Sequence, residues 1–222
     1  MIKLDRMERL PTTLPVFRVR STILMPQAQL PISMSEDDYM TIASEAFENN
    51  IVAVVQPKPI FMKGARNKEL IQSFKTGCAG RITEVFPAGN DVTINIHGLC
   101  RFEIVEEVVP DNSGICKIVV NYDKFLVDMN DQEDKQFEFD KDRLMNALDV
   151  YFKHLEISPN WKEIEKTPVD VLVSALAMAC PFHPSEKQSL LETVDVKARS
   201  DMITRIIEMN SFDRYDTAST VN

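Results

Sequence analysis

Apolar and polar residues alternate along the middle of the chain, between Val92 and Ile104. One set is mainly apolar: Val92, Ile94, Ile96, Gly98, Cys100, Phe102 and Ile104. The residues between them are mostly polar: Thr93, Asn95, His97, Leu99, Arg101 and Glu103. A period of two is typical of a β-strand with one face on a core and the other toward water. Gly98 interrupts the run without a side chain, which predicts a bend or bulge.

The segment just before this strand supplies its partner, so residues 77–107 predict a β-hairpin. Residues 78–86 form the partner strand, and Pro87-Ala88-Gly89-Asn90-Asp91 has the composition of a turn. A bend at the glycine would let one long strand pair with other strands in two parts of a curled sheet. Small β-barrels are commonly built from hairpins of this kind.

Further strands and one helix are predicted around the hairpin. The strands cover residues 14–26, 29–34, 51–56 and 115–122. Pro31 suits an edge strand, whereas the continuous apolar run "IVAVVQ" is typical of a strand buried on both faces. Ser35, with Asp38 three residues on, resembles a capping box and starts a helix that runs to about Asn49.

The last third of the chain has the spacing of helices. Asp140 caps the first, and Asn160 starts a short second turn. Thr167 and Pro168 supply a cap and a first-turn proline for a third helix, which Pro181 ends. Pro184 opens a fourth helix. The final helix carries an apolar set: Val196, Met202, Ile203, Ile206 and Ile207.

Two stretches of the sequence carry a resemblance to a known family. They are "GCAGRITEVF" with "INIHGLCRFEIVEE" in the hairpin, and "VLVSALAMACPFHPSEKQSLLETVDVKARSDMITRII" in the helices. Both resemble the N-terminal, substrate-binding domain of Lon proteases, and the chain is expected to be a stand-alone member without ATPase or protease domains. The resemblance implies an α+β fold, with an N-terminal PUA-like β pseudo-barrel that includes one helix, followed by a C-terminal helical bundle.

The acidic stretch "DMNDQEDKQ" between the two parts is expected to be a mobile connector. We therefore predict a β-rich subdomain over residues 1–130, a helical subdomain over 131–212 and a disordered tail over 213–222. His183 stands before Pro184, where the family more often has a small capping residue. It either caps that helix or has another role.

Composition and charge narrow the class of protein. The chain has 222 residues and a net charge of −9. The part from Phe125 onward holds 11 basic and 19 acidic residues, a net charge of −8 that disfavours nucleic acid. No apolar run is long enough for a bilayer, and the N-terminus lacks the apolar region of a signal peptide, which predicts a cytoplasmic location. The four cysteines are dispersed and distant from the three histidines, so no metal site is predicted.

The motifs of catalysis are not found in the sequence. Lys75-Thr76 lacks the glycines of a phosphate-binding loop. Ser185 and Lys187 would point apart on one helix, and adjacent acids are more often solvated faces than acid/base pairs. We predict a protein that is not an enzyme and needs no cofactor.

The resemblance implies a module that binds unfolded or damaged polypeptide clients, holding them or delivering them to a separately encoded ATP-dependent protease. Four residues of an irregular segment are the candidate contacts: Pro59, Ile60, Phe61 and Met62. They either lie under the barrel or form an exposed patch that grips apolar segments. RNA or nucleotide binding through the nearby lysines and arginine is the alternative. A third hypothesis is a subunit that forms a homo-oligomer through its helical half.

Overall fold

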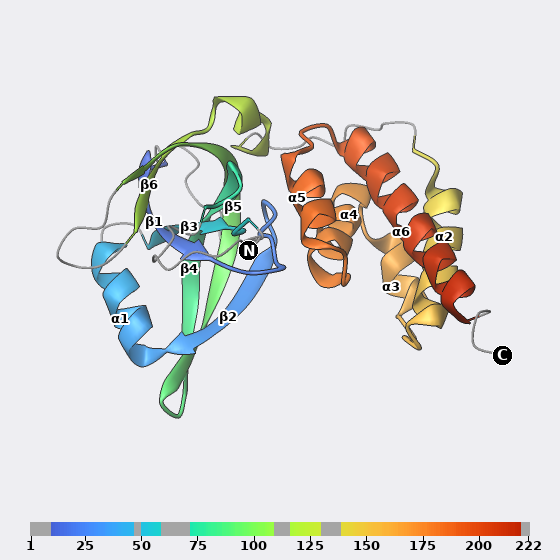
Figure 1. The fold of residues 1–222 in the computed structure, drawn as a ribbon, viewed down its shortest axis with the longest axis horizontal. Coiled ribbons are helices and arrows are strands. Elements are labelled where there is room, and N and C mark those ends of the chain that lie inside the picture. Colours follow the sequence, from blue (N-terminus) through green and yellow to red (C-terminus); the bar gives the residue numbers. More distant parts are fainter. Residues whose placement is uncertain (1–9, 47–49, 59–71, 109–115, 130–138, 219–222) are drawn as a thin grey trace, which may run out of the picture. The chain divides into compact units, whose positions relative to one another are not determined.

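The computed structural model describes residues 10–46, 50–58, 72–108, 116–129 and 139–218 (Figure 1). The chain divides into two compact units, residues 1–133 and 134–222. The first contains a six-stranded sheet and the second contains helices that pack together, so the predicted α+β class is confirmed.

The strands of the first unit form a ring-like pseudo-barrel. They pair in the order β2-β5-β4-β3-β1-β6, and an additional pairing of β5 with β6 closes the ring. Only β1 and β3 run parallel among the described pairs. The elements are β1 Thr13–Arg18, β2 Gln29–Ser35, α1 Glu36–Glu45, β3 Ile51–Val55, β4 Thr76–Ala88, β5 Asp91–Val108, β6 Lys117–Asn121 and the 3-10 segment η1 Asp123–Met129.

The predicted hairpin is confirmed as β4 and β5, and β5 serves both halves of the ring. Residues 91–97 of β5 pair with β2, and residues 103–108 pair with β6. The register shifts where Ala79 pairs with Cys100 but Gly80 pairs with Gly98, which is the bulge expected at this glycine. A single strand therefore carries pairing on both sides of the bend.

Gly98 is needed because another segment of backbone lies directly against it. The Gly98 N–H donates to Ala28 O at 2.9 Å, and the Gln27 N–H donates to Gly98 O at 2.8 Å. A Cβ atom at Gly98 would lie 2.1 Å from Met25 O. Glycine permits this close approach. The first strand ends at Arg18, earlier than the predicted Pro26, because the chain leaves the sheet here and buries Ile23, Leu24 and Met25 without strand structure.

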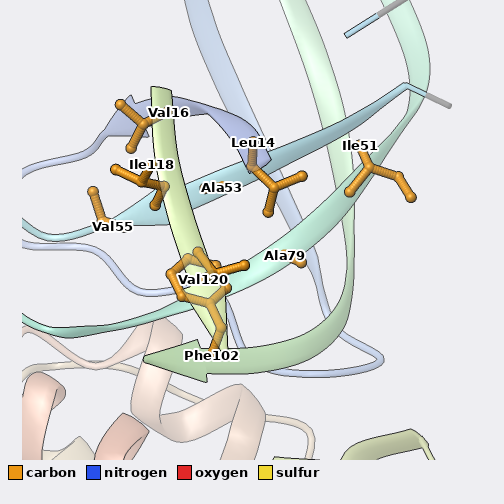
Figure 2. Packing of buried hydrophobic residues seen from close by; sticks show 9 residues of the cluster. All are labelled: Leu14, Val16, Ile51, Ala53, Val55, Ala79, Phe102, Ile118 and Val120. Carbon is orange, nitrogen blue, oxygen red and sulfur yellow. The ribbon is translucent and has the colours of Figure 1, made fainter. Parts of the chain in front are cut away.

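The core of the ring is formed by inward-facing side chains of five strands (Figure 2). All five residues of β3 are buried, as the continuous apolar run predicted. β2 lies at the end of the strand order, where Pro31 pairs with Asn95. The cluster consists of Leu14, Val16, Ile51, Ala53, Val55, Ala79, Phe102, Ile118 and Val120.

The second unit contains five helices among its described residues. They are α2 Lys141–His154, α3 Trp161–Lys166, α4 Val169–Ala179, α5 Pro184–Glu192 and α6 Val196–Ala218. The long helix α6 packs against α2, α4 and α5. Buried leucines of α2, α4 and α5 and isoleucines of α6 form the core. The helix α6 continues to Ala218, six residues into the segment for which the sequence predicted a disordered tail.

The helix starts follow local capping chemistry. Ser35 Oγ accepts from Asp38 N at 3.2 Å, and Asp140 accepts from Arg143 N at 2.9 Å, both as predicted. His183 is the N-cap of α5, with a reciprocal bond from its own N–H to Glu186 at 2.7 Å. The predicted cap at Thr167 is wrong, because the Thr167 hydroxyl donates back to Glu163 O at 2.7 Å and Pro168 occupies the N-cap position of α4.

Candidate functional site

The predicted contact residues Pro59, Ile60, Phe61 and Met62 lie outside the described residues, in the connection between β3 and β4. The structure describes the two ends of this connection, residues 56–58 and 72–74, and they are hydrogen-bonded to each other. Lys58 N donates to Gln72 O at 2.8 Å, and Phe74 N donates to Gln56 O at 2.9 Å. These bonds flank an isolated antiparallel bridge between Pro57 and Ser73, which brings the two ends of the connection together.

Arg18, the last residue of β1, links the base of the connection to a second strand. Its Nε donates to Ser73 Oγ at 3.1 Å, and its Nη2 forms an ion pair with Glu107 at 3.0 Å. Both partners of the ion pair are partly exposed, so solvent weakens its contribution to stability. Through these two contacts Arg18 links Ser73, which precedes β4, to Glu107 near the end of β5.

Several large apolar side chains of the first unit are exposed. Phe86 and Val85 lie near the tip of the β4–β5 hairpin and are 50% and 39% exposed. Val105 and Val108 are exposed near the end of β5, and Leu126 and Met129 on η1. Scattered apolar residues of this kind are ordinary on protein surfaces and do not by themselves define a site.

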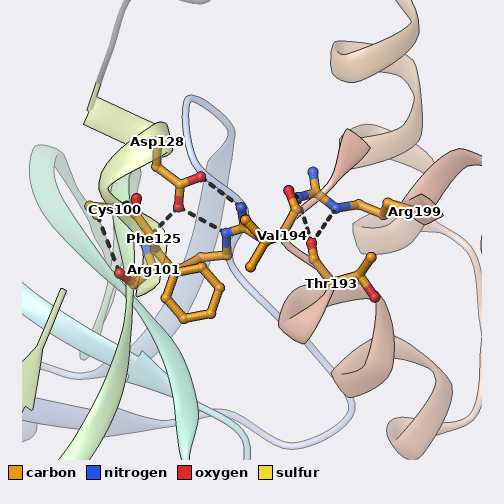
Figure 3. A network of polar contacts seen from close by, with 7 residues as sticks. All are labelled: Cys100, Arg101, Phe125, Asp128, Thr193, Val194 and Arg199. Atoms are coloured by element: carbon orange, nitrogen blue, oxygen red, sulfur yellow. Dashed lines mark hydrogen bonds and ion pairs between the residues drawn. The ribbon is translucent and has the colours of Figure 1, made fainter. Parts of the chain in front are cut away.

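A buried ion pair attaches η1 to β5, and the sequence did not predict it. Arg101 Nε donates to Asp128 Oδ2 at 2.8 Å and its Nη2 donates to Oδ1 at 2.7 Å, while the backbone N–H of Arg101 also reaches Oδ2 at 3.0 Å (Figure 3). The guanidinium lies 4.6 Å from the ring centroid of Phe125. Such bidentate, stacked geometry is characteristic of arginine.

Two predictions are wrong at this pair. Arg101 was expected on the water-facing side of the strand, yet it is 1% exposed, because η1 covers that face. Asp128 was expected in a mobile connector, yet it is buried on η1. The pattern around Asp128 is acidic, and acidic runs are usually solvated. No pattern in the sequence links an arginine inside a strand to an acid 27 residues downstream.

The second unit contains a groove between α2 and α6, with a volume of about 520 Å³. Its lining is mainly apolar, with Ala147 and Val150 from α2. Arg143 and Glu208 join the two helices across it, through two hydrogen bonds of 2.7 Å. The hydrogen bonds from Arg143 lower the pKa of the Glu208 carboxyl. The remaining lining residues are Asp140, Asp142, Asn146 and Ser211.

Ser185 and Lys187 have separate partners, in keeping with the predicted divergence on one helix. Ser185 Oγ lies 2.7 Å from His183 Nδ1, a contact within the cap of α5. Lys187 is buried and its Nζ donates to Met178 O at 2.8 Å, and burial lowers its pKa. The hydroxyl and the ammonium therefore do not form a Ser-Lys catalytic pair.

All four cysteines are free. Burial raises the pKa of Cys100 to about 12 and that of Cys180 to about 11, so both thiols stay protonated at neutral pH. Within the described ranges, no group of three or more histidine, cysteine or acidic side chains is arranged to hold a metal ion. Over the same part of the chain, no helix has the length and apolar character required to cross a bilayer.

The family model of the ATP-dependent protease La (LON) substrate-binding domain matches residues 13–209. The chain belongs to this family. The match covers described elements of both units, from β1 to α6. The predicted resemblance to the LON substrate-binding domain is therefore confirmed.

Relatives and solved structures agree with this assignment. The chain is 24% identical to a Lon protease of Desulfosudis oleivorans over 211 residues and 30% identical to one of Flavobacterium johnsoniae over 203 residues. These alignments cover 89% and 87% of this chain but 24% and 23% of the proteases. The chain thus spans about a quarter of the relatives' length, and the matched region is their non-catalytic N-terminal part.

Two solved structures share the fold. The Lon N-terminal domain protein from Xanthomonas campestris superposes with a TM-score of 0.57 at 17% identity, covering 87% of this chain and 97% of that one. The N-terminal domain of Mycobacterium avium complex Lon protease gives a TM-score of 0.54 at 18% identity, covering 90% and 98%. At this level of identity the likeness supports the fold.

Proposed function

We propose that this LON substrate-binding domain is a non-catalytic module that binds unfolded or damaged polypeptides in the cytoplasm. It holds these clients or delivers them to a separately encoded ATP-dependent protease. The family match over residues 13–209 is the observation that carries the proposal. The pseudo-barrel supplies a rigid support on which connecting segments can carry binding residues.

The connection between β3 and β4 is the proposed contact region, with Pro59, Ile60, Phe61 and Met62 as its binding residues. Its base is fixed by the Lys58–Gln72 and Phe74–Gln56 hydrogen bonds and by Arg18. Large apolar side chains presented on an anchored connection would bind the apolar segments that an unfolded client exposes. A backbone closed at its base limits the entropy lost when a client binds.

The test is alanine at Phe61 and Met62 together in the full chain. Binding of a reduced and carboxymethylated model protein should weaken by about tenfold or more, because two large apolar contacts are removed. The melting temperature should stay unchanged. The matched control is alanine at Ile157 and Val171, which are exposed apolar residues of the helical unit, each 49% exposed.

The possible results separate the alternatives. Equal loss of binding and of melting temperature in the Phe61 and Met62 variant would mean that these residues belong to the core, and would contradict the contact assignment. Salt-dependent retention of single-stranded RNA, without binding of the unfolded protein, would replace the proposal by the RNA-binding alternative.

A further inference from the structure

We propose that the groove between α2 and α6 binds a client segment in which lysine or arginine residues flank apolar ones. This inference rests on the proposed function and gives it a second contact region with a stated preference. The groove is separate in sequence from the β3–β4 connection, so the two contact regions can be tested independently.

The size and lining of the groove suit a short segment of polypeptide. A volume of about 520 Å³ is that of an ordinary ligand pocket, which holds a few side chains. Ala147 and Val150 form an apolar part, and Val150 is 39% exposed although it lies beside the buried core of the helix pair. An apolar side chain of a client would remove this surface from water.

The negative charge around the groove favours basic flanking residues in the bound segment. Three carboxylates line it, from Asp140, Asp142 and Glu208, against one guanidinium, Arg143. Because Arg143 and Glu208 neutralise each other, the two aspartates leave a net negative charge. The N-terminus of α2 carries a partial positive charge of about one half, which offsets only part of it.

The two charges beside the groove cancel each other, and the net charge of the whole unit is negative. Asp201 acts electrostatically on Arg143, and Arg205 acts on Glu208, so these two neighbours balance. Residues 134–222 hold 11 basic and 16 acidic residues, a net charge of −5. An acidic surface attracts a cationic segment and repels an anionic one, which sets both the rate of encounter and the choice of partner.

The test uses three labelled peptides that share one apolar core and differ in their flanking residues: lysine, glutamate or serine. Fluorescence anisotropy with the full chain should show the tightest binding for the lysine peptide and the weakest for the glutamate peptide. This order should disappear in about 1 M salt, where charges more than about 3 Å apart are screened.

Matched variants place the effect at the groove. Val150→Lys should weaken binding of the lysine peptide by about tenfold, because it fills the apolar part and offsets about half of the charge of the two aspartates. Val171→Lys makes the same change on the exposed side of α4 and should leave binding unchanged. Asp142→Asn should weaken binding by about two- to fivefold, whereas Asp170→Asn, in the first turn of α4, should not.

The results of the peptide and variant measurements test different parts of the proposal. Failure of all three peptides to bind would overturn the groove, whereas the proposed function is decided separately by binding of the reduced and carboxymethylated protein. Binding of all three peptides with equal affinity, or equal effects of Val150→Lys and Val171→Lys, would overturn the groove assignment and leave the proposed function standing. A lower melting temperature for Val150→Lys leaves Asp142→Asn as the deciding variant, because Asp142 is exposed.

Discussion

Among the described residues, each unit buries one arginine, and the two have different hydrogen-bond acceptors. Arg101 in the pseudo-barrel is 1% exposed and forms a bidentate ion pair with the Asp128 carboxylate. Arg199 in the helical unit is 4% exposed and donates to backbone carbonyls, with Nη2 2.8 Å from Thr193 O and 3.3 Å from Val194 O (Figure 3). Thr193 is the C-cap of α5.

The difference shows what a sheet and a helix offer to a buried cation. The peptide groups of a sheet are used in its ladders and its strand dipoles largely cancel, so Arg101 needs a carboxylate from another element. The C-terminal end of a helix has unpaired carbonyls and a partial negative charge, and Arg199 donates to the carbonyls of Thr193 and Val194 there. The Asp128 carboxylate is 27 residues from Arg101 in the sequence, whereas Thr193 and Val194 are 6 and 5 residues from Arg199.

Breaking the ion pair in the first unit is expected to have the largest effect. Asp128→Asn leaves the buried Arg101 guanidinium without its charge partner, and the free energy of unfolding should fall by about 3 to 5 kcal/mol. Urea denaturation followed by circular dichroism measures this loss. Asp123→Asn, an exposed acid of the same 3-10 segment, is the control and should change stability by less than about 0.5 kcal/mol.

The double variant Arg101→Met with Asp128→Leu sharpens the same test. Replacing both partners with apolar side chains should recover most of the lost stability, since no buried charge remains. If the double variant is as unstable as Asp128→Asn, packing and not charge pairing explains the role of Asp128.

Removing the arginine of the second unit should have an intermediate effect. Arg199→Met leaves buried carbonyls at the end of α5 without these donors, and the free energy of unfolding should fall by about 1 to 3 kcal/mol. Arg199→Lys should retain part of the stability, since an ammonium can still reach a carbonyl and interact with the helix end. Identical losses in the two variants would contradict the assignment of a charge effect at this helix end.

The smallest expected effect concerns His97 on β5, which lies beside the positively charged Arg81. Burial and the charge of Arg81, its partner across β4 and β5, lower the pKa of His97. The unfolded chain binds a proton near pH 6.5 and the native state only at lower pH, so stability is complete above about pH 6.5 and falls below it.

The measurement compares wild type with His97→Gln between about pH 8 and about pH 5. The free energy of unfolding of the wild type should fall more steeply toward acid than that of the variant. A parallel pH dependence in the two proteins would show that His97 titrates alike in both states.

The local parts of the fold could be predicted from the sequence, and the parts that depend on distant pairings could not. Period-two alternation, Gly98 and the residues Ser35 and Asp140 each act over a few positions, and the hairpin, bulge and caps are confirmed. Burial of Arg101 depends on η1 folding back onto β5, which no period in the strand encodes. The residues themselves gave no sign of this return.

The candidate sites differ in the same way. Phe61 and Met62 were predicted because large apolar residues stand in an irregular segment, a signal readable from sequence; they lie outside the described residues and stay a prediction. The groove depends on α2 packing beside α6, about sixty residues further along the chain, and neither helix indicates the groove by itself. The ion pair between Arg143 and Glu208 is visible only in the three-dimensional structure.

The continuous strand β5 has a consequence for how the ring can fail. A slip of one residue would turn the side chains of all eighteen positions to the wrong face, in both halves of the ring together. A slipped β5 would expose core side chains of the ring, so burial of this one strand favours a single alignment of the sheet.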